Sequence, residues 1–99
     1  MADIGIFVTG FPGFIAGRLI EQLIENRDEK THFYFLVQPQ FSLQARMRCQ
    51  ELERIYTSFQ KHWHLIEGDL RRPDLGIDAK EMKKLVKGVT EVWHLAAIY

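Results

Sequence analysis

The chain has 99 residues, which fits a single domain, and its 13 basic and 13 acidic residues leave it without net charge. This balance argues against a sequence-independent nucleic-acid binder, which needs an excess of Lys and Arg. A single cysteine, Cys49, excludes an intramolecular disulfide, and no apolar run approaches the roughly 20 residues of a membrane span. The first residues include Asp3 and do not resemble a signal peptide, so we expect a cytoplasmic protein.

Near the N-terminus, two glycines connect an apolar strand to an amphipathic helix. The run 4–8 predicts a strand covered on both faces, and residues 13–26 predict a helix with one apolar stripe. Between them, Gly10 permits a tight turn, Gly13 lets a pyrophosphate approach the backbone, and Ala16 is the small third residue of the fingerprint. Such a loop presents backbone N–H groups to a phosphate, although it could also be a plain strand-to-helix turn.

The next two elements are a strand and a long helix. Residues 32–37 are almost entirely apolar and predict a strand that Pro39 ends. Residues 42–60 predict a helix with Ser42 as its N-cap. Its apolar face is formed by Cys49, Leu52, Tyr56 and Phe59.

The last part of the chain repeats this alternation. Residues 63–67 predict a third strand and residues 89–95 a fourth. The helix between them begins at a capping box from Asp78 to Glu81 and runs to about Lys87, with Gly88 at its C-terminal stop. A hydrophobic staple is expected between Ile77 and Met82.

Strands that alternate with helices predict an α/β fold, here a Rossmann-type doubly wound parallel sheet with the order β-α-β-α-β-α-β along the chain. The strand order should be 3-2-1-4, with the first two helices on one face and the third on the other. The fourth strand would then keep an unpaired edge, which makes self-association possible. We therefore expect residues 1–99 to be the N-terminal part of one dinucleotide-binding Rossmann domain, truncated before its remainder.

Three segments resemble the extended short-chain dehydrogenase/reductase family. Residues 9–16 (TGFPGFIA) resemble its cofactor loop, residues 67–70 (EGDL) the segment whose Asp contacts adenine, and residues 92–97 (VWHLAA) the strand on the nicotinamide side. All three fall at the carboxyl ends of strands, where an open α/β sheet binds its ligands. Residues 36–39 and 68–76 are most similar to the male-sterility-type branch, which contains fatty acyl-CoA and thioester reductases.

This resemblance implies a nicotinamide dinucleotide as cofactor. Asp69 could instead form only an Asx-turn, and His94 is more simply a core residue than a cofactor contact. The implied cofactor-binding residues are Thr9, Gly10, Phe11, Gly13, Phe14, Ile15, Gln38, Asp69, Leu70, Leu95, Ala96 and Ala97.

The residue that follows the second strand bears on the choice between NAD and NADP. A carboxylate there would bind the ribose 2′-OH and favour NAD, but this chain has Gln38. Because nothing there repels a 2′-phosphate, we predict NADP, with NAD possible. Related reductases often carry Arg at this position, so another residue must supply the ion pair, with Arg46 or Arg18 as candidates.

The family's catalytic Ser or Thr and its Tyr-x-x-x-Lys pair are not present in this chain. Tyr34 and Tyr56 are followed four residues later by Gln, and Tyr99 is the last residue. We therefore predict no catalytic residue here. No metal site is predicted either, because His62 and His64 share a strand face but no further ligand is indicated.

The predicted function is the NAD(P)-binding portion of an oxidoreductase, with the cofactor carrying the hydride chemistry. An acyl thioester, aldehyde or ketone is the expected substrate, a small molecule bound through the missing half of the domain. Two alternatives remain open: a nucleotide-sugar epimerase or dehydratase of the same family, and a non-catalytic dinucleotide-binding redox sensor.

Overall fold

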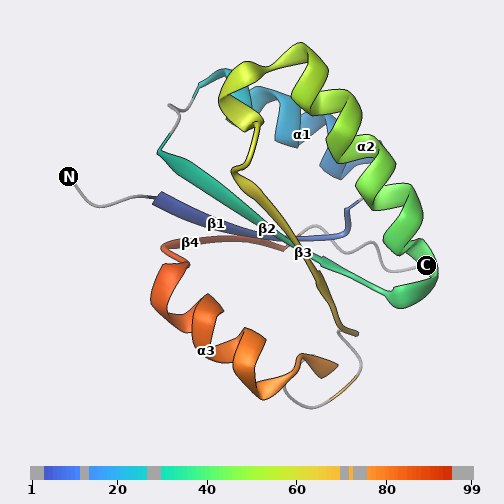
Figure 1. Cartoon of the computed structure of the whole chain (residues 1–99), viewed down its shortest axis with the longest axis vertical. Helices are drawn as coiled ribbons and strands as arrows, with labels where there is room; N and C mark the ends of the chain where they lie inside the picture. Colours follow the sequence, from blue (N-terminus) through green and yellow to red (C-terminus); the bar gives the residue numbers. More distant parts are fainter. Residues whose placement is uncertain (1–3, 12–13, 27–29, 70–71, 73–75, 95–99) are drawn as a thin grey trace.

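The computed structural model describes residues 4–11, 14–26, 30–69, 72 and 76–94, and in these ranges four strands alternate with three α-helices (Figure 1). The strands are β1 (Ile4–Thr9), β2 (Thr31–Val37), β3 (Trp63–Glu67) and β4 (Glu91–His94). The helices are α1 (Phe14–Glu25), α2 (Ser42–Ile55) and α3 (Ala79–Gly88), with short 3-10 helices η1 (Pro39–Phe41) and η2 (Thr57–Phe59) on either side of α2.

The four strands form one parallel sheet in the order β3-β2-β1-β4. Ile6 of β1 pairs with Phe33 of β2 on one side and with Glu91 of β4 on the other, and Phe33 pairs with Trp63 of β3. The predicted doubly wound order is therefore confirmed. Because the strands are parallel, all their carboxyl ends meet at one edge of the sheet.

Helices α1 and α2 cover one face of the sheet, as predicted (Figure 1). The apolar stripe of α1 and the inner side of α2 meet the strand residues that point to this face, because alternate strand residues share a face. The main core contains Ile6, Val8, Phe11, Ile20, Leu23, Ile24, Phe33, Phe35, Val37, Ala45, Cys49, Leu52 and Phe59.

Helix α3 lies against the opposite face (Figure 1). Leu85 of α3 and Ile77, just before it, pack on Phe7, Leu36 and Ile66 of the sheet. This second core is smaller because one helix covers the face in the described part of the chain. Over the same residues, no helix is long and apolar enough to cross a membrane.

The helix predicted at 42–60 is shorter in the structure. α2 ends at Ile55, Tyr56 is extended with φ −121° and ψ 105°, and the chain turns through η2 before Lys61 adopts a positive φ of 64°. Ser42 is not the N-cap, because the chain enters α2 directly from η1. Phe41 occupies the cap position and makes no side-chain cap bond.

The start of the helix predicted at 78–87 is confirmed and its end is not. The side chain of Asp78 accepts a hydrogen bond from the backbone N–H of Lys80 at 3.1 Å, and not from that of Glu81 as in the predicted capping box, and the staple residues Ile77 and Met82 join one apolar cluster. Gly88 is the last residue of α3 rather than its stop. The fourth strand begins at Glu91 and not at residue 89, because the two intervening residues turn the chain onto β1.

Candidate functional site

The connection from β1 to α1 has the geometry of a tight turn. Thr9 ends β1 with 2% of its surface exposed, and Gly10 follows with a φ of 86°, a left-handed conformation that favours glycine. The ring of Phe11 is buried and stacks on Phe35 with ring centroids 4.3 Å apart. This stacking anchors the loop to the core, so any contribution of Phe11 to a ligand site comes from its backbone.

Helix α1 begins immediately beyond this turn, at Phe14 and Ile15. The first N–H groups of a helix lack partners within the helix and carry a partial positive charge. No acidic residue stands in the first turn of α1 to offset that field. The loop residue Gly13 lies outside the described residues.

The end of β2 carries neutral side chains. Gln38 follows β2 and is partly exposed, and its Oε1 accepts a hydrogen bond from Nε2 of Gln40 at 2.6 Å. Pro39 begins η1 and directs the chain into α2. Neither glutamine can form an ion pair with a phosphate, and neither repels one.

The end of β3 lies beside the end of β2. The N–H of Gly68 donates to the carbonyl of Val37 at 3.0 Å and so extends the ladder beyond the last strand residues. Asp69 comes next and is half-buried, and its backbone carbonyl accepts a hydrogen bond from the N–H of Arg72 at 3.0 Å. Residue Leu70 lies outside the described residues.

A cavity of about 740 Å³ opens between the ends of β2 and β3 and the starts of α2 and α3. Its lining includes Asp69, one of the predicted cofactor-binding residues, and Arg46, one of the two predicted partners of a 2′-phosphate. Sequence reasoning missed most of its polar lining, which comes from η1, the start of α2, the end of β3 with the segment after it, and the start of α3. The polar side chains of the lining are Gln40, Ser42, Arg46, Glu67, Asp69, Arg72, Asp78 and Glu81.

The two arginines predicted as partners of a 2′-phosphate differ in position. The guanidinium carbon of Arg46 lies 5.9 Å from the centroid of the Trp63 ring, and the same side chain borders the cavity. Arg18 is exposed on α1 and does not line the cavity. Of these two arginines, only Arg46 is among the residues that line the cavity.

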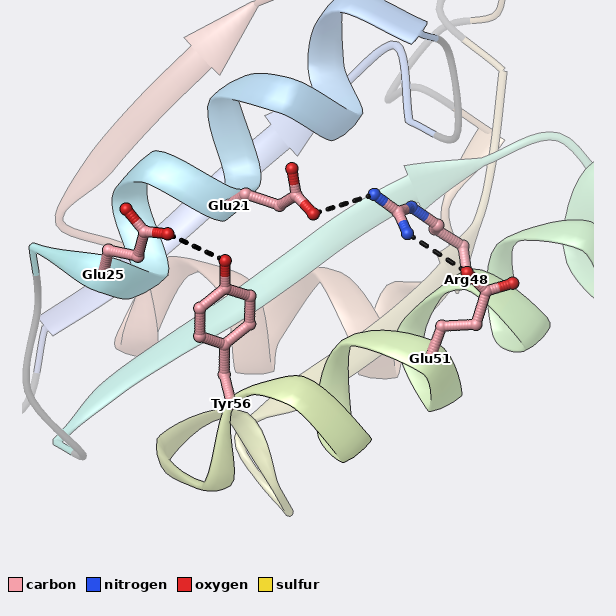
Figure 2. A network of polar contacts seen from close by, with 5 residues as sticks. All are labelled: Glu21, Glu25, Arg48, Glu51 and Tyr56. Carbon is pink, nitrogen blue, oxygen red and sulfur yellow. Dashed lines mark hydrogen bonds and ion pairs between the residues drawn. The ribbon is translucent and has the colours of Figure 1, made fainter.

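Polar contacts connect α2 to α1, the helix that follows the glycine loop, as Figure 2 shows. Arg48 forms an ion pair with Glu21 of α1 at 3.3 Å and with Glu51 of its own helix at 3.2 Å. The hydroxyl of Tyr56 donates to Glu25 at 2.9 Å, and this hydrogen bond raises the pKa of Tyr56. Each contact is solvent-accessible and stabilises only modestly, so the contacts to α1 add to the apolar packing that holds this helix on the sheet.

The end of β4 lies next to the glycine loop, because His94 pairs with Thr9 in the sheet. The structure thus brings the ends of β1, β2, β3 and β4 to one edge, as the predicted cofactor site requires. The remaining predicted residues at this edge, Leu95, Ala96 and Ala97, lie outside the described residues.

A parallel sheet of order 3-2-1-4 with a glycine turn leading into α1 defines a Rossmann-type dinucleotide-binding domain. Residues 8–99 match the model of an NAD-binding family described as male sterility protein, and the chain belongs to this family. Family membership supports a nicotinamide dinucleotide as the cofactor.

Relatives of known sequence and structure agree with this assignment. The chain is 29% identical to the fatty acyl-CoA reductase wat of Drosophila melanogaster over 104 residues, covering 96% of this chain and 20% of that protein. It is 28% identical over 97 residues to a trichosetin synthetase of Gibberella fujikuroi, covering 98% of this chain and 2% of the synthetase.

Among solved structures, the chain resembles the reductase domain of a non-ribosomal peptide synthetase from Mycobacterium tuberculosis. The TM-score is 0.78 at 25% identity, and the likeness covers 97% of this chain and 24% of that domain. The chain therefore spans 20% of the fatty acyl-CoA reductase and 24% of the reductase domain that it resembles.

Proposed function

We propose that this chain binds NADP(H) and orients it for hydride transfer at the carbonyl carbon of an acyl thioester, an aldehyde or a ketone. The observation that carries the proposal is the left-handed turn at Gly10, which joins β1 to α1 at the carboxyl edge of the sheet. The names of its relatives, a fatty acyl-CoA reductase and a peptide synthetase reductase domain, support the substrate class.

Each part of the dinucleotide has a counterpart at this edge. The pyrophosphate fits the N-terminus of α1, where backbone N–H groups are available and no acidic side chain opposes it. The adenosine would fit the cavity between β2 and β3, which Asp69 lines, and the nicotinamide would then extend toward the end of β4. The bound cofactor supplies the hydride, and the residues of this chain hold and orient it.

The preference for NADP depends on charge near the adenosine ribose. Gln38 is neutral, and Arg46 is the arginine of α2 that lines the cavity. Four carboxylates and two arginines line the cavity. Because the carboxylates repel a 2′-phosphate, its binding there depends strongly on an ion pair with Arg46. Removing Arg46 should therefore affect NADPH and spare NADH.

Calorimetric titration of the purified protein with NADPH and with NADH tests this proposal. We expect NADPH to bind at least about tenfold more tightly, since a hydrogen bond to a charged group contributes about 1.5–3 kcal/mol. Arg46→Gln should abolish that difference by weakening NADPH alone, while the matched change Arg18→Gln leaves both affinities unchanged. Equal or reversed affinities in the wild type would contradict the NADP preference, and equal weakening of both cofactors by Arg46→Gln would contradict the role of Arg46.

The acid–base residues of the family are not among the 99 residues. Tyr34 and Tyr56 both lack a lysine four residues later, and Tyr56 is engaged with Glu25 in the α1–α2 contact. The part that this chain takes in the reaction is thus to bind and position the dinucleotide.

A further inference from the structure

Three histidines gather at the amino ends of β2 and β3, away from the candidate dinucleotide site. The rings of His32 and His62 meet edge to face with centroids 4.8 Å apart, and His32 stacks on His64 at 6.0 Å. Tyr34 joins this group because its ring stacks on that of His64, with the two ring centroids 4.9 Å apart. The register explains the cluster, because Tyr34 pairs directly with His64 across the two strands.

Strand β3 is an outer strand of the sheet, bound in the described residues to β2 alone. At its amino end the contact continues with the N–H of Phe33, which donates to the carbonyl of His62 at 2.8 Å. Nδ1 of His62 also lies 3.0 Å from the carbonyl oxygen of Ser58. The imidazole cluster therefore lies where β3 joins the sheet.

We propose that His32, His62 and His64 form an acid-responsive lock that holds the outer strand β3 to β2. When neutral, the three rings pack on one another and on Tyr34. When more than one ring is protonated, positive charges lie as close together as the packed rings. Their repulsion opposes this packing.

The groups around His64 favour its neutral form. His64 is exposed as a residue, but partial desolvation of its ring lowers its pKa, and the neighbouring His32 lowers it further, as do His62 and Lys84 of α3. Glu81, also on α3, acts in the opposite direction without reversing the shift. These residues, with Tyr34, are the titratable or charged groups that β2, β3 and α3 present to His64 in the described structure.

The direction of the pH effect follows from the protons bound in each state. In the unfolded chain each imidazole titrates near its ordinary pKa of about 6.5, whereas His64 in the folded chain takes up its proton at lower pH. The unfolded state therefore binds more protons in this window, and stability increases with pH. The contribution is complete above about pH 6.5 and is lost as the pH falls through the folded pKa of His64.

Two measurements on the full chain test the lock. NMR titration of the histidine ring signals should place the midpoint of His64 below the ordinary histidine value, and His32→Gln should raise that midpoint. The proposal would be overturned if the titration midpoint of His64 lay at or above the ordinary histidine pKa, or if His32→Gln left that midpoint unchanged.

The second measurement is urea unfolding at pH 7.5 and 5.5. The unfolding equilibrium constant of the wild type should rise on acidification, and the fold-increase should be smaller in His64→Gln. The exposed position of His64 allows this variant to fold. An equal fold-increase in wild type and variant would show that the cluster does not control the acid response.

Discussion

Gly5 of β1 and Gly88 at the end of α3 meet backbone to backbone. A Cβ on Gly5 would overlap the carbonyl oxygen of Gly88 and lie 2.7 Å from its carbonyl carbon. Thr90 closes the same contact, since its N–H donates to the carbonyl of Gly5 at 2.7 Å and its hydroxyl lies 3.2 Å from both the N and the O of Gly5. This contact positions the start of β4 against β1 at the amino edge of the sheet, opposite to the edge that carries the candidate site.

Gly5→Ala should destabilise the fold by about 1–3 kcal/mol, because the atoms it would overlap belong to the backbone and cannot rotate away. Gly17→Ala is the matched control. A Cβ there would meet only the side chain of Arg48, at 3.9 Å, and alanine favours the helix by about 0.5–1 kcal/mol. Urea unfolding of both variants should give shifts of opposite sign. Equal stability of Gly5→Ala and wild type would show that the two backbones are not in contact.

Thr31 carries a buried hydroxyl with no hydrogen-bond partner among the described residues, at 1% exposure. Thr31→Val replaces this hydroxyl by a methyl group of the same shape, so the free energy of unfolding should rise by about 1 kcal/mol. Thr90→Val removes a hydroxyl that is hydrogen-bonded to Gly5 and should lower the free energy of unfolding by a similar amount. Thermal unfolding compares the two, and a loss of stability in Thr31→Val would mean that the hydroxyl is hydrogen-bonded in solution.

The thiol of Cys49 should be unreactive in the folded chain. Cys49 is fully buried on the inner side of α2, and burial, reinforced by Glu53, raises the pKa of its thiol to about 12. Because the thiolate is the reactive species, an aromatic disulfide reagent at pH 8 should label Cys49 only as the chain unfolds. Labelling in urea provides the reference rate. Native labelling as fast as that of the unfolded chain would contradict the burial of this residue.

Much of the fold follows from local patterns. The apolar strands alternate with amphipathic helices, which leads to a parallel sheet, and the doubly wound arrangement typical of a glycine loop after the first strand leads to the order 3-2-1-4. The N-cap at Asp78 is a local signal that the structure confirms. The end of α2 could not be placed from sequence, because the apolar spacing from Tyr56 to Phe59 suits a further helical turn and a 3-10 helix equally well.

The site was less accessible to sequence reasoning because it depends on contacts between elements. Gly10 and Asp69 could be chosen from their positions after strands, but Asp78 and Glu81 line the cavity with Asp69 only because the start of α3 packs near the end of β3. The sequence also indicates that His62 and His64 share a strand face. Their contact with His32 depends on the register between β2 and β3, which no local pattern specifies.

The central claim is that the glycine loop after β1 binds the phosphates of a nicotinamide dinucleotide. Calorimetric titration of NADPH into the wild-type protein and into Gly13→Val tests it most directly, with circular dichroism and urea unfolding to verify that the variant is folded. We predict saturable binding to the wild type and no detectable binding to a folded Gly13→Val, because a side chain at this position keeps the pyrophosphate from the backbone. Unchanged affinity in the folded variant would contradict the claim.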